Sequence, residues 1–261
     1  YGNPDASVRA AAPQVGFFTR IESSIMVAHI LKLSLCLVAS MFLLAVNNAI
    51  AASRCFGSVA SGRIEASVKL PASGKNYTAY SVMGAALGRT YVHDRVHTVV
   101  IDAFRRLESL RPDTRYVYGE TGWESGGRFR PHRTHQNGLS VDFFVPVRDK
   151  SGASVPLPTS VTNKFGYDIN FDREGRFDGL SIDFEAVAEH LMALHKSAVA
   201  NGIDLALVIF DPPYLSKLFS TPHGAYLRKH IRFMQGNAWV RHDEHYHVDF
   251  KVPCAPLAAS K

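Results

Sequence analysis

Near the C-terminus the chain reads His242-Asp243-Glu244-His245-Tyr246-His247-Val248-Asp249-Phe250. Polar and apolar residues alternate from His245 onward, which is the pattern of a β-strand with one face in the core. The alternation directs three polar side chains to one face: His245, His247 and Asp249. Two imidazoles two positions apart on a strand lie about 7 Å from each other. They can therefore act on one metal ion, or on a metal ion and the water bound to it.

A second polar cluster lies well upstream and reads His132-Arg133-Thr134-His135-Gln136-Asn137-Gly138-Leu139-Ser140-Val141-Asp142. One continuous strand would place His135 and Asp142 on opposite faces, because their separation is odd. Gly138 resolves this, since His135 then belongs to a loop and the strand begins near Leu139. Asp142 stands between apolar neighbours, and a buried carboxylate needs a partner charge. Together the two clusters offer the imidazole and carboxylate ligands of a catalytic zinc ion.

The rest of the chain predicts one α+β domain, with a central, mainly antiparallel sheet that carries the zinc site and is flanked by helices. Apolar spacing predicts helices over 93–110, from Ser181 or Asp183 to about 201, and over 224–234. Strands are expected over 115–118, 141–147, 205–210 and 244–252, and strands with loops over 53–87. Residues 148–179 read as a long polar loop, which we expect to line a groove.

The N-terminal part predicts export. From Met26 the chain reads like a secretory signal, with an apolar run over 33–46 and a closing Ala49-Ile50-Ala51. The run is short for a membrane span of about 20 residues, although an uncleaved anchor is the alternative. We therefore expect an upstream, disordered segment over 1–25 and a signal peptide over 26–51. Residues 52–261 would then form the mature periplasmic domain, without a stable membrane span after cleavage.

Cysteine use agrees with export. The chain has three cysteines, and Cys36 falls within the expected signal. In an oxidising compartment Cys55 and Cys254 read as one disulfide, with two free buried thiols as the alternative. The net charge of +6 at pH 7 suits an anionic polymer substrate, but scattered surface Arg and Lys explain it equally well. No long basic run is present, so a nucleic-acid partner is not expected.

The pattern His-x(6)-Asp followed by His-x-His resembles the zinc peptidases that group lysostaphin-type enzymes, D-Ala-D-Ala dipeptidases and hedgehog domains. The resemblance is closer to one branch, the penicillin-insensitive murein endopeptidases, whose motifs match Gly126–Phe129, His132–Asp142 and His242–His247. Ser140 departs from this branch, which often has an acidic residue there. His132 matches one position of a possible second metal site, but its remaining partners cannot be placed.

Carried over to this sequence, the resemblance implies that His135, Asp142 and His247 are the zinc ligands, with water in the fourth position. It makes His132 a candidate ligand of the second metal. In this family zinc activates the water that attacks an amide carbon.

Two further histidines are expected to act in catalysis. There is no His-Glu-x-x-His helix to supply a Glu base, so His245 is the candidate to take the proton of the water and pass it to the leaving amine. His242 would hydrogen-bond in the site or, if protonated, stabilise the oxyanion. Glu120 and Trp123 are expected in the groove.

The expected function is a periplasmic zinc endopeptidase that cuts peptidoglycan cross-links between D-alanine and meso-diaminopimelate. A zinc mechanism has no acyl-serine step, so penicillin should not inhibit it. One alternative is a D-Ala-D-Ala carboxypeptidase or dipeptidase of the same group. Another is a zinc-bound murein-recognition module that does not cut. The intact pair His242 and His245 favours an enzyme, because a binding module has no need for it.

Overall fold

The computed structural model describes residues 51–257, which belong to one compact unit, Ala51–Lys261. The predicted upstream segment (1–25) and the predicted signal peptide (26–51) lie outside the described residues, apart from Ala51, and both stay predictions. Among residues 51–257, no helix combines the length and the apolar character that crossing a membrane requires.

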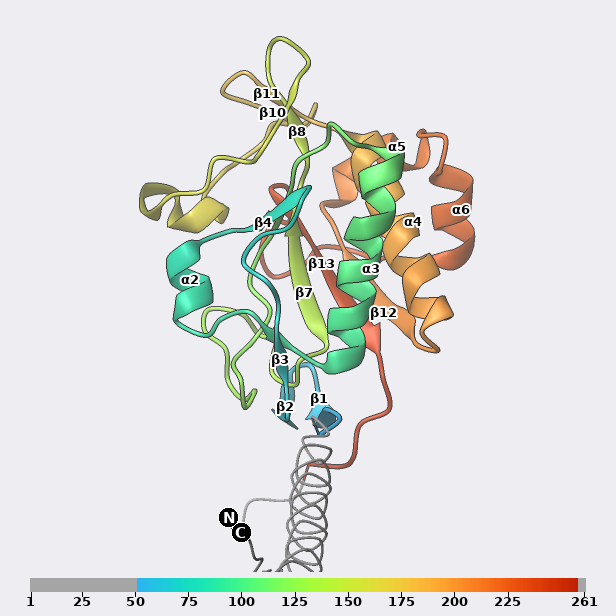
Figure 1. Ribbon diagram of the computed structural model, residues 1–261. Coiled ribbons are helices and arrows are strands. Elements are labelled where there is room, and N and C mark those ends of the chain that lie inside the picture. Colours follow the sequence, from blue (N-terminus) through green and yellow to red (C-terminus); the bar gives the residue numbers. More distant parts are fainter. Residues whose placement is uncertain (1–50, 258–261) are drawn as a thin grey trace, which may run out of the picture. The chain divides into compact units, whose positions relative to one another are not determined.

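A five-stranded sheet forms the centre of this unit, with the strand order β12-β13-β7-β6-β4 (Figure 1). Neighbouring strands pair antiparallel, except β4 and β6, which pair in parallel. The prediction of a central, mainly antiparallel sheet in an α+β domain is therefore confirmed. In sheet order the strands span Asp204–Ile209 (β12), His245–Lys251 (β13), Ser140–Phe144 (β7), Tyr116–Tyr118 (β6) and Tyr77–Ala79 (β4).

Two long helices, α3 (Asp94–Leu110) and α4 (Phe184–Ala200), pack together on one face of this sheet (Figure 1). Side chains cap both N-termini: His93 accepts the N–H of Arg95, and the Asp183 carboxylate accepts the N–H of Ala186. The helical spacing seen in the sequence is confirmed in α3, where it buries Val96, Val99, Val100, Ala103, Phe104 and Leu107.

The inward face of β13 packs into this helical layer. The hydroxyl of Tyr246 contacts Nδ1 of His190 on α4, and both side chains are fully buried. Phe104 of α3 stacks on the His190 ring with 5.0 Å between ring centroids. Burial lowers the pKa of His190 to about 3, so this imidazole is a neutral core residue. The alternate residues of β13 therefore point into the core, as the sequence predicts.

Two shorter helices lie beside α4. Helix α5 (Pro212–Phe219) begins with a proline at its first position and was not predicted. Helix α6 (Gly224–His230) is shorter than the predicted 224–234. The chain turns extended at Ile231, and Phe233 then pairs with Val208 at the edge of the sheet. This edge pairing ends the helix early.

The prediction of one long polar loop over 148–179 is wrong in part. Four very short strands form a second sheet here, in the order β10-β11-β8-β9. Strands of two or three residues are too short to show alternation, so the sequence cannot reveal them. The elements are β8 (Val147–Arg148), β9 (Ser154–Val155), the 3₁₀ segment η1 (Val161–Gly166), β10 (Arg176–Phe177) and β11 (Leu180–Ile182).

The N-terminal part of the unit consists of short strands and loops, as predicted, with one short helix. That helix, α2, begins after Ser81, whose hydroxyl accepts the N–H of Gly84. It places the side chains of Val82, Met83 and Leu87 on the surface. The elements are β1 (Arg54–Ser58), β2 (Ser61–Glu65), β3 (Val68–Lys69), α2 (Val82–Ala86) and β5 (Tyr91–Val92).

A disulfide joins Cys55 of β1 to Cys254, which follows β13, across 199 positions of the sequence. Backbone hydrogen bonds reinforce the link, because Ala255 N–H donates to Cys55 and Gly57 N–H donates to Ala255. The predicted pairing is confirmed. A loop of this length predicts a stabilisation of about 5 kcal/mol from loop-closure entropy.

Exported protein should therefore show no free thiol after denaturation without reductant. Replacing Cys55 and Cys254 together by serine should lower the free energy of unfolding by about 2–5 kcal/mol, because the unfolded chain regains its freedom. Denaturant titration of the double variant and the parent protein measures this difference. Two labelled thiols per chain in the unreduced parent would contradict the linkage.

Candidate metal centre

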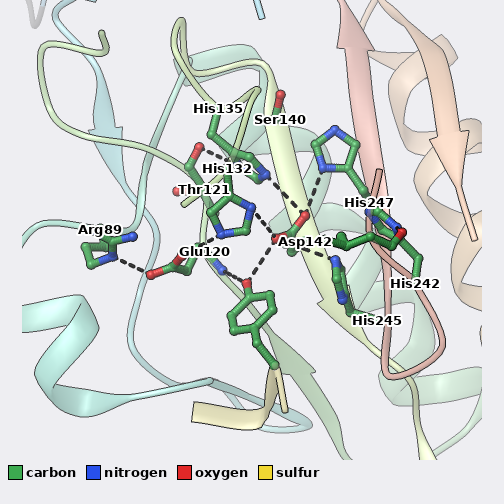
Figure 2. Close-up of polar contacts among 12 residues, drawn as sticks. Arg89, Glu120, Thr121, His132, His135, Ser140, Asp142, His242, His245 and His247 are labelled. Atoms are coloured by element: carbon green, nitrogen blue, oxygen red, sulfur yellow. Dashed lines mark hydrogen bonds and ion pairs between the residues drawn. The ribbon is translucent and has the colours of Figure 1, made fainter. Parts of the chain in front are cut away.

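The candidate site forms where β7 and β13 lie side by side (Figure 2). The register sets His247 opposite Asp142 and Asp249 opposite Ser140. Directly opposed residues of an antiparallel pair point to the same face, about 4.5–5.5 Å apart at Cβ. Nδ1 of His247 accordingly lies 2.9 Å from Oδ1 of Asp142. Strand pairing alone thus brings the two sequence clusters together.

His135 reaches the same carboxylate oxygen from the loop before β7. Its backbone has φ +66°, and its Nε2 lies 3.2 Å from Oδ1 of Asp142. Nδ1 lies 3.1 Å from the carbonyl oxygen of Thr121. A carbonyl oxygen can only accept a hydrogen bond, so Nδ1 carries the hydrogen. Nε2 therefore keeps its lone pair and faces Asp142. The prediction that a loop folds this imidazole back onto the strand is confirmed.

Asp142 is fully buried, and its second oxygen has other neighbours. The hydroxyl of Tyr167 donates to Oδ2 at 3.0 Å and accepts the backbone N–H of Glu120 at 2.9 Å. Burial raises the pKa of Asp142, but the imidazoles of His135 and His245 outweigh this and hold it well below its ordinary value. Asp142 is thus a buried carboxylate whose partners are histidine side chains, as its apolar strand context requires.

His132 approaches Asp142 from the side of Tyr167. Its Nδ1 lies 3.7 Å from Oδ2 of Asp142, and its Nε2 lies 2.7 Å from Oε2 of Glu120. The other oxygen of Glu120 accepts hydrogen bonds from Arg89 and, at 2.9 Å, from the Tyr80 hydroxyl. Burial opposes charge on Glu120, but His132 and Arg89 outweigh it and lower the Glu120 pKa to about 2.

These side chains can hold a metal ion. Potential ligand atoms of His132, His135 and Asp142 all lie within 4.8 Å of one another. Nε2 of His135 is buried and has no hydrogen-bond partner, which is the state of a ligand atom. Burial lowers the pKa of His247, but the carboxylates of Asp249 and Asp142 outweigh burial and raise this pKa to about 10. The position of the His247 ring therefore favours a positive charge. Imidazole and carboxylate ligands together are a donor set that zinc accepts.

The second nitrogen of His247 is held by a carboxylate on its own strand. Nε2 lies 2.8 Å from Oδ1 of Asp249, and the Ser140 hydroxyl donates to the same oxygen at 2.6 Å. A carboxylate on the outer nitrogen is the usual way to orient a metal-binding imidazole. The sequence placed Asp249 on the correct face but did not reveal this contact.

His245 and His242 complete the cluster, so all six predicted site residues meet here. Nε2 of His245 lies 3.8 Å from Oδ2 of Asp142, and burial lowers the pKa of this imidazole to about 4. The His242 ring lies 4.7 Å from the His245 ring, and its Nδ1 lies 2.9 Å from the carbonyl oxygen of Val240. Burial and His245 lower the pKa of His242 to about 3, so Nε2 of the neutral ring accepts hydrogen bonds.

A cavity of about 690 Å³ opens onto this cluster. Apolar side chains line much of it, among them Met83 of α2, Leu87 directly after this helix, and Trp239. Phe165 and Tyr167 also line it, so the predicted groove-lining role of the 148–179 segment is confirmed. Glu120 lines the cavity, as predicted. Trp123 does not, and its ring packs on Phe129 with 5.1 Å between centroids.

The carboxylate of Asp249 should matter for metal binding. Asp249→Asn should weaken metal affinity by about 10–100-fold, because the outer nitrogen of His247 loses its charged partner. Ser140→Ala is the matched control, since it removes one hydrogen bond to the same oxygen and leaves the charge. Competition with a chromophoric chelator measures both affinities. Equal affinity in Asp249→Asn and the parent protein would show that this contact does not support a ligand.

A family model described as penicillin-insensitive murein endopeptidase matches residues 55–259. A search of curated proteins gives no match to this chain. The matched range contains both polar clusters, the paired cysteines and every strand of the central sheet. The chain belongs to the penicillin-insensitive murein endopeptidase family.

Proposed function

We propose that this protein is a periplasmic, zinc-dependent endopeptidase that hydrolyses the peptide cross-links of peptidoglycan between D-alanine and meso-diaminopimelate. Membership of the family implies murein endopeptidase activity. The observation that carries the proposal is the convergence of imidazoles from two distant segments on one buried carboxylate, Asp142, beside a cavity of about 690 Å³.

In this proposal His135, Asp142 and His247 hold the metal, and His132 is a further metal-binding residue. Each of the three imidazoles turns one ring nitrogen toward Asp142. The other nitrogen faces an acceptor, which is Thr121 for His135, Asp249 for His247 and Glu120 for His132. This arrangement fixes the rings before any metal binds. Zinc, when bound, would act as a Lewis acid that polarises the scissile carbonyl and lowers the pKa of the attacking water.

His245 moves the protons. Its Nε2 faces Asp142 at 3.8 Å, and the low pKa that burial gives it keeps the free ring neutral and able to accept a proton. We assign it the proton taken from the attacking water and returned to the leaving amine. His242, beside it, accepts a hydrogen bond from the substrate through Nε2, because Val240 engages Nδ1. No serine forms an acyl-enzyme in this route, so penicillin has no group to acylate.

The mature protein should bind about one zinc ion per chain. His135→Ala or Asp142→Ala should abolish tight binding, because a catalytic zinc site uses three protein ligands and each variant leaves only two of the proposed set. Elemental analysis after extensive dialysis gives the metal content. Full occupancy in either variant would remove that residue from the ligand set.

Purified sacculi treated with the mature protein and then digested with a muramidase should give more uncross-linked and fewer cross-linked muropeptides than untreated sacculi, and a chelator should abolish this difference. Mass spectrometry of the products identifies the bond cut. Release of free D-alanine or of its dipeptide would instead support a carboxypeptidase or dipeptidase. Retention on sacculi without any product would support a murein-recognition module and overturn the proposed activity.

The two histidines at the start of β13 should separate proton transfer from metal binding. His245→Ala should keep its zinc and lose cleavage by about 10²–10⁴-fold, the usual effect of removing a general acid–base. His247→Ala should lose both, although it lies only two residues along the same strand face. Zinc content is measured beside muropeptide release. If His245→Ala is metal-free and His247→Ala is loaded, the two roles are reversed.

A further inference from the structure

We propose that Glu244 is a positioning residue that holds the His245 ring through Nδ1 and so directs Nε2 to the reacting groups. This inference rests on the proposed function, since it assigns a partner to the proton-transferring histidine. The residue carries no role in the sequence motifs, which concern only the histidines around it.

The contact is direct and buried. Oε1 of Glu244 lies 2.8 Å from Nδ1 of His245, and the two residues are 4% and 3% exposed. Successive residues of a regular strand point to opposite faces, so they do not normally touch. Glu244 lies in a bend directly before β13 begins at His245. This bend allows its side chain to turn back onto the next ring.

The other close neighbours of the His245 ring include two aromatic rings, which offer Nδ1 no strong acceptor. The rings of Tyr167 and Phe144 flank His245 with centroids 5.2 and 6.1 Å away. Nε2 points the other way, toward Asp142. An acceptor on Nδ1 favours the tautomer with its hydrogen there, and a neutral imidazole then has its lone pair on Nε2. That is the form that can take a proton from water.

The protonation state of Glu244 decides which of the two groups donates the hydrogen of this contact. An ionised carboxylate can only accept the Nδ1 hydrogen, whereas a protonated carboxyl can also donate to Nδ1. The tautomer of His245 is therefore the property that decides the proposal.

The neighbouring carboxyl provides a matched control. Oδ2 of Asp243 accepts the backbone N–H of Phe171 at 2.7 Å and lies 3.1 Å from Nη1 of Arg241. Asp243 is as buried as Glu244, and its carboxyl interacts with that of Glu244 as well as with these groups, so it reports a nearby charge change that does not remove the contact to His245. A change that acts only through local charge would affect both positions alike.

The first test is spectroscopic and needs no substrate. Nitrogen-15 spectra of the histidine-labelled mature protein should show His245 with its hydrogen on Nδ1, assigned with His245→Ala. Glu244→Met should lose this preference, and Asp243→Asn should keep it. A hydrogen on Nε2 in the parent protein, or an unchanged tautomer in Glu244→Met, would overturn the proposal.

The second test uses cleavage of a soluble cross-linked muropeptide. Glu244→Met should lower kcat by about 10–100-fold, the usual range for a partner that orients a site histidine, with KM and zinc content near those of the parent. Glu244→Gln, which retains an acceptor oxygen, should restore most of the rate. On the His245→Ala background Glu244→Met should cost nothing further, because its effect passes through that ring.

These outcomes separate this inference from the proposed function. An inactive parent protein would overturn the endopeptidase proposal, and the spectra would still decide whether Glu244 orients His245. An additional loss in the double variant would show that Glu244 acts elsewhere and overturn its positioning role. If Glu244→Met does not fold, the parent spectrum and the Glu244→Gln rate still test the inference.

Discussion

The pairing of β7 with β13 is the constraint on which the site depends. It sets Asp142 directly opposite His247 in the middle of the sheet, where the carboxylate has no access to water. A lone carboxylate could not remain ionised there. The histidines around it make the ionised form stable, and the helices α3 and α4 support the same strands from behind. Fold and site therefore share one piece of backbone.

One arrangement recurs around Asp142. Four imidazoles turn one nitrogen toward its carboxylate, and an acceptor at the periphery binds the other nitrogen. The acceptor is the Thr121 carbonyl for His135 and the Glu120 carboxylate for His132. It is Asp249 for His247 and Glu244 for His245. Ring orientation is thereby set by the protein itself. Tyr167 joins two parts of this network, since its hydroxyl contacts both Asp142 and the backbone of Glu120.

The sequence predicted most of this because the signals were local. Alternation in β13 indicated which side chains share a face, and Gly138 indicated where a loop gives way to a strand. The position of Tyr167 could not be predicted, because it is a single aromatic residue in a segment whose strands are too short to show a period. The contact of Ser140 with Asp249 depends on the register between two strands distant in sequence. No pattern within either strand encodes that register.

The alternation along β13 also specifies a single way to assemble the sheet. A slip of one residue would carry His245, His247 and Asp249 into the layer beneath α3 and α4, and would bring Tyr246, Val248 and Phe250 out toward the cavity. Each polar group that the slip buries without a partner would cost on the order of 1–3 kcal/mol. One misaligned strand would bury several such groups at once. The residues that form the candidate site thus also exclude the competing alignments of its central strand.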